Sequence, residues 1–382
     1  MIKEAKRELE KYFDSNRWKV IDNGDESLFY KNRDPLNIKE HEFLGYSKKK
    51  NILQASDVIN YIKEIFMQRG YEQRESEPII RPKESSTFFT TSGVQAFEYE
   101  LLNGEPMNMT NSLFIQPVIR TNYARNLREG SVSSFVNPST VRFGGNSTQY
   151  VEDLDGWMKI LSGMGLYLGD FIFKLKEKKG DINSSNPWKR NSGFSVSCSY
   201  GGLGLGVAGY YLSSETGSSF ADIGFGLERL LWARNKNATF REVVGTLPYS
   251  FNQGIETIDA IRSLSLMSMF DIDSNKDASN QFRKYLLKID RDCSDVESQF
   301  RSAHKFWRQF ITPEKEEYEA VSHLMRNINK VRNMDSLVRV GIPSVPKELT
   351  RMVSHDENTF LRELIKLRQW IAPSIKNIYK KV

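Results

Sequence analysis

Two stretches near the start of the chain space their apolar residues as an amphipathic helix does. In residues 1–13 apolar side chains recur every three to four positions, from Ile2 to Phe13, which predicts a helix. Residues 55–69 repeat the same period and predict a second amphipathic helix. The stretch between them is polar and rich in turn residues. We therefore expect residues 1–50 to form an appended N-terminal segment.

Short apolar runs replace the helical pattern between residues 77 and 225. They are rich in Val, Ile, Phe and Tyr and are separated by turn residues, which is typical of strands. Residues 153–165 supply a helix between two of them. Strands that follow one another with few helices between them indicate an antiparallel sheet, because a parallel pair needs a crossover connection. We expect an α+β domain at residues 51–245.

Helical periodicity returns from about residue 252 and continues through the remaining sequence. This pattern predicts an all-helical C-terminal domain at residues 246–382. The net charge of +6 is uneven, because residues 281–382 carry 20 Lys and Arg against 13 Asp and Glu. A basic domain favours contact with a polyanion such as RNA, and a solvated helical surface is the alternative.

The composition, with 39% hydrophobic and 27% charged residues, is that of a globular protein. No stretch approaches the roughly 18 apolar residues that span a membrane, and the first 13 residues lack an apolar signal core. We expect a cytoplasmic chain. Cys198 and Cys293 are far apart and the four histidines form no metal-binding pair, so neither a disulfide nor a zinc site is expected.

The run GLGVAG at residues 204–209 satisfies the glycine fingerprint of a dinucleotide-binding loop. Such a loop requires a strand before the first glycine and a helix after the last. Here Gly209 is followed by Tyr-Tyr-Leu, which is a strand pattern. The run therefore predicts a strand that carries glycines in its interior, where something approaches the backbone closely.

The segment that carries most chemistry is ADIGFGLERL at residues 221–230. It predicts a strand that enters Gly224-Phe225-Gly226, and a helix that begins at Leu227. Glycines at such a turn bring the start of a helix close to a ligand. Arg229, on the first turn of that helix, could then reach a phosphate group.

This segment resembles motif 3 of the class II aminoacyl-tRNA synthetases, and its D-x-G-x-G-L-E-R form is most similar to the alanyl type. Residues 81–97 are similar to the segment after motif 1, and residues 114–130 resemble motif 2, with Gln116 four residues before Arg120. The resemblance covers about residues 55–240. It implies an antiparallel sheet flanked by helices, and a ligase that forms an adenylate from ATP.

The resemblance also assigns roles to individual residues. In this family the motif 2 arginine holds the α-phosphate of ATP and the motif 3 arginine holds the γ-phosphate, which makes Arg120 and Arg229 the catalytic residues, with Gly226 beside the nucleotide. Fixed guanidinium groups stabilise the charge that develops during phosphoryl chemistry. Asp222, near Gly224, matches the family aspartate that binds the ammonium group of the amino acid.

In the family, the strand before motif 3 forms the floor of the amino acid pocket. The resemblance therefore places Gly204, Gly206, Val207 and Gly209 on a floor that lacks large side chains and leaves room for substrate. Tight packing beneath a helix is the alternative explanation for these glycines.

The returning strand of motif 2 departs from the family pattern. Arg142 stands where the family has an acid, and the aromatic residues that contact adenine are replaced. We expect Phe135, Arg142 and Phe143 to supply contacts to ATP instead. No Asp or Glu occurs between residues 195 and 212, and Glu215 is the nearest candidate ligand for Mg²⁺.

The acceptor of the activated amino acid stays open at the level of sequence. The motif 2 loop carries Arg125 and Arg128, and in the family this loop meets the acceptor end of tRNA. The resemblance thus favours transfer to tRNA. A carrier-protein thiol or small molecule, or a non-catalytic RNA-binding relative, are the alternatives. Class II cores are often dimers, so a homodimer is an open possibility.

Overall fold

A computed structural model of the chain divides into two compact units. The first comprises residues 1–245 and 309–312, and the second comprises residues 246–308 and 313–382. The described residues are 1–24, 26–32, 52–105, 110–123, 127, 130–184, 187–235, 239–245, 253–289, 293, 295–339, 353, 355, 356, 358–360 and 362.

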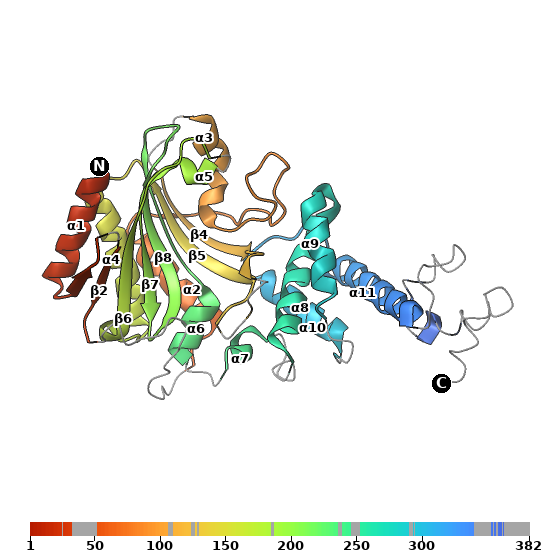
Figure 1. Cartoon of the computed structure of the whole chain (residues 1–382). Helices are drawn as coiled ribbons and strands as arrows, with labels where there is room; N and C mark the ends of the chain where they lie inside the picture. Colours follow the sequence, from red (N-terminus) through yellow and green to blue (C-terminus); the bar gives the residue numbers. More distant parts are fainter. Residues whose placement is uncertain are drawn as a thin grey trace. The chain divides into compact units, whose positions relative to one another are not determined.

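The described part of the first unit is built on a nine-stranded sheet (Figure 1). Each strand pairs antiparallel with its neighbours, except that β3 and β4 are parallel. In sheet order the strands are β1 (Lys19–Asp22), β2 (Glu26–Tyr30), β6 (Phe171–Lys178), β7 (Ser192–Tyr200), β8 (Leu203–Leu212), β9 (Ser219–Phe225), β5 (Ser134–Phe143), β4 (Asn111–Ile119) and β3 (Glu72–Gln73). The α+β fold expected from the strand pattern is confirmed.

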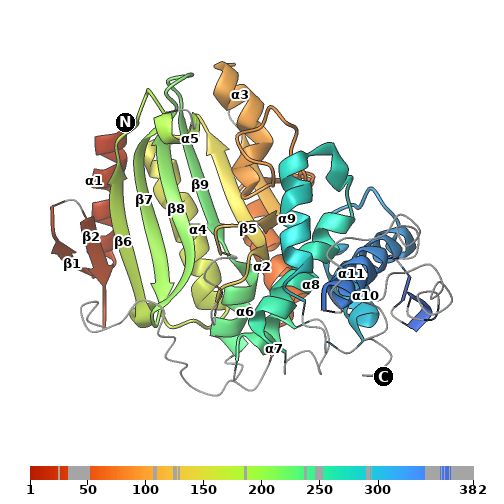
Figure 2. The same ribbon diagram turned by 45° about the vertical axis from the view of Figure 1, so that its right-hand side comes forward.

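Helices α1 (Ile2–Ser15), α2 (Ala55–Met67) and α4 (Ser147–Gly163) lie on one face of this sheet (Figures 1 and 2). Helix α6 (Leu227–Asn235) begins directly after β9. The remaining short helices of this unit are η2 (Gly93–Phe97), α3 (Glu98–Asn103), η4 (Leu168–Asp170), α5 (Pro187–Arg190) and α7 (Arg241–Val244).

The first 32 residues are part of this unit and not a separate appendage. Phe13 of α1 is fully buried, and its ring stacks on Phe29 of β2 at 4.2 Å and tilts against Phe173 of β6 at 5.2 Å. Strands β1 and β2 therefore extend the sheet at its edge. The described part of residues 1–50 is therefore not the appended segment that we expected. The alternating burial around Phe29 is that of a half-buried strand.

Strand β5 shows how period-two alternation separates the two faces of the sheet. Its even-numbered residues contact α4: Thr140 accepts a hydrogen bond from Nε1 of Trp157 at 3.0 Å, and Arg142 donates two hydrogen bonds of 2.7 Å to Asp153. Residues at odd positions, such as Phe135, consequently face the other side of the sheet. That other side holds the candidate site.

The glycine-rich run after β7 serves two structural purposes. Gly201 and Gly202 have φ of 53° and 88°, so they form the two-residue turn between β7 and β8 that favours glycine at both positions. The run at residues 204–209 lies inside β8. Its location in a strand, with β9 as the next strand, confirms that it does not have the strand-then-helix form of a dinucleotide-binding loop.

The described part of the second unit is helical, as expected. Its elements are α8 (Ile255–Ser268), η6 (Ile272–Ser274), α9 (Lys276–Leu286), α10 (Val296–Trp307) and α11 (Glu317–Arg339). Arg262 of α8 is buried with its guanidinium carbon 4.7 Å from the ring centroid of Trp307, and Nε1 of Trp307 donates to the carbonyl of Arg262. This contact fixes α10 against α8.

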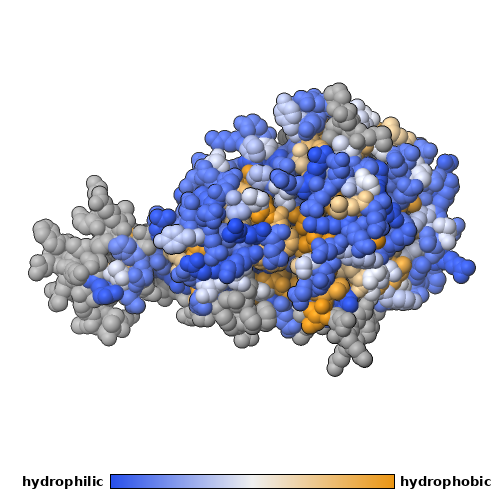
Figure 3. Space-filling model, turned by 180° about the vertical axis from the view of Figure 1, so that it is seen from behind, coloured by the Kyte–Doolittle hydropathy of each residue, from blue (hydrophilic) through white to orange (hydrophobic). Residues whose placement is uncertain are grey.

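Hydrophilic side chains cover most of the face seen from behind in Figure 3. Within the described part of the chain, no helix combines the length and apolar character needed to cross a bilayer. One exposed hydrophobic residue, Val207, is 45% exposed although it lies in the middle of β8. Its exposure follows from its position at a cavity.

Candidate active site

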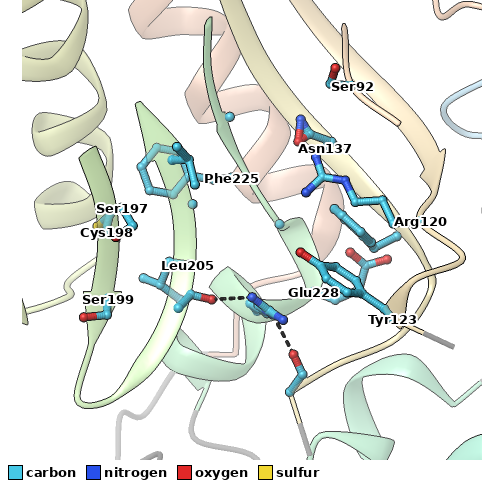
Figure 4. Close-up of a pocket in the computed structure, with 18 of the residues that line it drawn as sticks. Ser92, Arg120, Tyr123, Asn137, Ser197, Cys198, Ser199, Leu205, Phe225 and Glu228 are labelled. Atoms are coloured by element: carbon cyan, nitrogen blue, oxygen red, sulfur yellow. Dashed lines mark hydrogen bonds between the residues drawn. The ribbon is translucent and has the colours of Figure 1, made fainter. Parts of the chain in front are cut away.

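A cavity of about 460 Å³ lies in the first unit, on the face of the sheet opposite α4. Figure 4 shows Arg120, Tyr123, Asn137 and Glu228 on one side of it, and Ser197, Cys198, Ser199 and Leu205 on the other. Nine residues singled out from the sequence line the cavity: Arg120, Phe135, Gly204, Gly206, Val207, Asp222, Gly224, Gly226 and Arg229. The fold thus gathers β4, β5, β8, β9 and the start of α6 around one space.

Arg120 follows the end of β4 and is held by contacts on two sides. Its Nε donates to the carbonyl oxygen of Thr91 at 3.0 Å, and its guanidinium carbon lies 5.1 Å from the ring centroid of Phe135. The Tyr123 ring stacks on Phe135 at 6.4 Å. These contacts preorganise Arg120, and the Phe135 ring contacts both the guanidinium and Tyr123.

Arg229 is fixed on the first turn of α6. Its Nε donates to the carbonyl oxygen of Gly130 at 2.6 Å and its Nη1 to that of Gly204 at 2.8 Å. These bonds tie the start of α6 to β8 and to the loop before β5. A guanidinium group held in this way has a fixed orientation at the cavity wall and cannot be neutralised near pH 7.

Asp222 is the carboxylate of β9 that faces the cavity, and its side chain accepts no hydrogen bond from another described residue. Burial raises its pKa to about 6, and the charge of Arg120 opposes that increase. A carboxylate with an increased pKa at a cavity is the type of group that gains most from a cationic ligand. Asp222 can therefore bind an ammonium group.

Asn137 is a cavity residue that the sequence analysis missed. Its side chain is 4% exposed, projects into the cavity in Figure 4 and makes no hydrogen bond to another described side chain. It lies across Gly224, where a Cβ would be 2.8 Å from Nδ2 of Asn137. The alternation of β5 could have identified it, because Asn137 is two residues beyond Phe135 and so lies on the same face.

The glycines of β8 differ in what they do. Gly204 has open space, since a Cβ there would lie 3.7 Å from Nη1 of Arg229. A Cβ on Gly206 would lie against the carbonyl oxygen of Gly224 and 2.7 Å from Cγ of Phe225. Gly209 is covered by the ring of Tyr211, which itself lines the cavity. Tight packing therefore accounts for the absence of side chains at Gly206 and Gly209, whereas Gly204 borders open space at the cavity.

Two residues expected to contact ATP lie elsewhere. Arg142 is on the α4 face of β5, where Asp153 pairs with it and both side chains are buried. Phe143 lies on the cavity face but at the far end of β5, packed 4.8 Å from Phe97 and 5.6 Å from Phe220 in an apolar cluster. For Arg142 the reason is register, because one residue of displacement along a strand reverses the face.

Glu215 does not reach the cavity. It lies between β8 and β9 and forms an ion pair with Arg190 at 3.3 Å. Arg125 and Arg128, expected to contact the acceptor, lie outside the described residues.

Mg²⁺ in nucleotide sites is usually held by one or two carboxylates together with the substrate phosphates. Asp222 and Glu228 are the carboxylates among the described cavity-lining residues. Glu228 accepts a hydrogen bond from the backbone N–H of Val136 at 3.1 Å. Within the described ranges, no group of three or more His, Cys, Asp or Glu side chains is arranged to hold a metal ion. The contribution of Mg²⁺ therefore stays a prediction.

Comparison with known proteins gives limited similarity. No family model and no curated protein matches the chain. Among solved structures, the chain is similar to Desulfitobacterium hafniense PylSc, a pyrrolysyl tRNA synthetase, with 16% identity, 50% of this chain and 71% of that chain covered, and a TM-score of 0.37. A second structure of pyrrolysyl-tRNA synthetase from the same organism has 15% identity, covers 55% and 76% of the two chains, and has a TM-score of 0.37.

Proposed function

We propose that this protein activates an amino acid with ATP to form an aminoacyl adenylate and transfers the aminoacyl group to the 3′ end of a tRNA. One observation carries the proposal: Arg120, Asp222 and Arg229 line the same cavity, although they come from different elements. Two fixed guanidinium groups suit a triphosphate, and one carboxylate suits an ammonium group.

The reaction follows from these three groups. The ammonium group of the substrate pairs with Asp222, which directs its carboxylate toward Arg120. A carboxylate oxygen attacks the α-phosphorus, the bond from that phosphorus to the β-bridging oxygen breaks, and pyrophosphate leaves. Arg120 and Arg229 stabilise the charge on the phosphoryl oxygens and on pyrophosphate. A hydroxyl of the acceptor then attacks the carbonyl carbon and AMP leaves.

Two features support tRNA as the acceptor. Residues 281–382 carry an excess of basic side chains, and the loop after Arg120 carries two more arginines in the sequence. The resemblance of residues 221–230 to the alanyl type makes alanine the first amino acid to test. A carrier-protein thiol remains the alternative acceptor.

A non-catalytic relative that binds RNA is the second candidate. One observation favours it: the ring of Phe135, which was expected to contact ATP, contacts Arg120 and Tyr123 instead. The preorganised arginines and the unpaired Asp222 favour the enzyme.

Amino-acid-dependent exchange of labelled pyrophosphate into ATP tests the proposal. Wild-type protein should give exchange with at least one of the twenty amino acids, and Arg120→Ala should reduce it by at least about 100-fold. The exposed Arg74, outside the cavity, provides the matched control Arg74→Ala, which should exchange like wild type. Absence of pyrophosphate exchange with all twenty amino acids would contradict the enzymatic function and leave the RNA-binding alternative. Where exchange occurs, labelled amino acid recovered on tRNA, and not on a carrier protein, identifies the acceptor.

A further inference from the structure

Tyr211 forms the wall of the cavity next to Asp222. It is on β8, two residues after Gly209, and Gly209 lies directly opposite Asp222 in the register of β8 and β9. The Tyr211 ring lies across Gly209, since a Cβ there would be 2.6 Å from both Cζ and Oη of the tyrosine. The ring is thus about one strand spacing, roughly 5 Å, from the strand that carries Asp222.

Contacts from neighbouring strands hold the ring in place. Nζ of Lys178 on β6 lies 5.2 Å from the ring centroid, and the same ammonium group donates to the carbonyl oxygen of Trp188 at 2.6 Å. On the other side the Phe220 ring is 5.3 Å away. Burial and the charge of Asp222 raise the pKa of the Tyr211 phenol, so the ring is neutral.

An apolar cluster lies behind Tyr211. The tyrosine packs against this cluster and also lines the cavity, so it separates the two. The buried members of the cluster are Val94, Leu101, Phe114, Val141, Phe143 and Phe220. Removal of the ring would therefore join the space beside Asp222 to a region with apolar walls.

We infer that Tyr211, seated on Gly209, is the residue that limits the size of the amino acid side chain this protein accepts. The inference rests on the proposed function. A substrate with its ammonium group at Asp222 has its carboxylate directed toward Arg120. Its side chain then points away from Arg120, toward the tyrosine ring. The glycine and the tyrosine act as a pair, because any side chain at residue 209 would displace the ring.

Variants of this pair test the inference in pyrophosphate exchange with glycine, alanine, valine, leucine and phenylalanine. Tyr211→Ala should raise kcat/KM for the larger amino acids relative to the best wild-type substrate by about 10- to 100-fold, whereas Tyr211→Phe should keep the wild-type ratios. Gly209→Ala should lower exchange with all five. The double variant Gly209→Ala/Tyr211→Ala should behave as Tyr211→Ala, because the added methyl group no longer meets a ring. Tyr99→Ala, at an exposed tyrosine outside the cavity, is the matched control.

Thermal melting of each variant, and binding of the same amino acids without ATP by saturation-transfer NMR, keep the outcomes distinct. Wild-type exchange together with unchanged ratios in a folded Tyr211→Ala or Tyr211→Leu variant would overturn the inference and leave the proposed function intact. Absent exchange, with Tyr211→Ala binding larger amino acids than wild type does, would overturn the function and support the inference. Binding of no amino acid by wild type or Tyr211→Ala would overturn both.

Discussion

Asp222 should destabilise the folded protein at neutral pH, and its replacement by asparagine should therefore increase stability while it removes function. Its ionised carboxylate makes no hydrogen bond to another described side chain and is held at a cavity wall. Asparagine has nearly the same shape without the charge. A residue that costs stability in the free protein is typical of a site that awaits a ligand of opposite charge.

The magnitude follows from the pKa of the Asp222 carboxyl, which rises from 3.8 to about 6 on folding. Each pKa unit corresponds to about 1.4 kcal/mol, so the ionised group disfavours folding by about 3 kcal/mol at most. Solvent at this partly exposed side chain reduces the penalty, and the expected gain for Asp222→Asn at pH 7.5 is about 1–3 kcal/mol. For a unit of this size the melting temperature should rise by about 2–10 °C.

The stability gained in Asp222→Asn should increase with pH. Between pH 3.8 and about 6 the folded state binds more protons at Asp222 than the unfolded state does, so the free energy of unfolding contributed by this group falls as pH rises. The advantage of Asp222→Asn should therefore be complete above pH 7 and fall to about one third by pH 4.5.

Urea unfolding at pH 7.5 and pH 4.5 measures both quantities, and amino acid titrations measure the loss of binding. Asp155→Asn is a control of opposite sign, because ion pairs with Lys159 and Arg69 lower the pKa of that carboxyl and its removal should destabilise. In exchange assays Asp222→Asn should raise the KM for the amino acid by about 10- to 100-fold. An Asp222→Asn variant that is less stable than wild type at pH 7.5, or whose gain does not change with pH, would refute the reasoning.

Three further predictions follow from contacts of single residues. Asp153→Ala should lower the free energy of unfolding in urea by about 3–5 kcal/mol, since it leaves the buried Arg142 unpaired. The double variant Arg142→Met/Asp153→Leu should recover most of this loss. Equal stability of the single and double variants would contradict the prediction. Gly204→Ala should melt within about 2 °C of wild type. Gly206→Ala should melt well below wild type, because a Cβ at residue 206 meets a backbone carbonyl and a Cβ at residue 204 does not. The opposite order of melting temperatures in calorimetry would contradict this explanation of Gly206. Arg229→Lys should reduce pyrophosphate exchange by at least about 100-fold, as lysine cannot donate to two carbonyls in a fixed plane, and exchange within threefold of wild type would exclude a role for the guanidinium geometry.

The order of strands and helices could be predicted from the sequence because the pattern there is local. Most successive apolar runs were separated by too few residues for a crossover helix, so a mainly antiparallel sheet followed from them. The strands near Phe29 were missed because they are short and lie at the edge of the sheet. Their position depends on a stacked contact between Phe13 and Phe29, which no local pattern records.

Arg120 and Arg229, which line the cavity, were found in the sequence because they lie at ends of elements, beside turns. Asp222 lies inside β9, but it stands two residues before Gly224. Their surroundings leave a recognisable string such as the one at residues 221–230. Arg142 was assigned wrongly for the opposite reason. It lies inside a strand, and there the face of the sheet is decided by register, which the bonds to Asp153 reveal only in three dimensions.

Gly209 could be identified from the sequence, whereas Tyr211 could not, because the side chain that covers a strand glycine is known only in three dimensions. A glycine inside a strand indicates that something lies close to the backbone, but not whether it is a ligand or a side chain of the same protein. At Gly204 the space is open to the cavity, and at Gly209 the occupant is the tyrosine two residues further along the strand. Side chains two residues apart on a strand share a face, so an aromatic residue at that spacing is the first candidate to cover a strand glycine. At Gly209 we expected a pocket floor without side chains. The Tyr211 ring covers this glycine instead, and substitution of the tyrosine would uncover it.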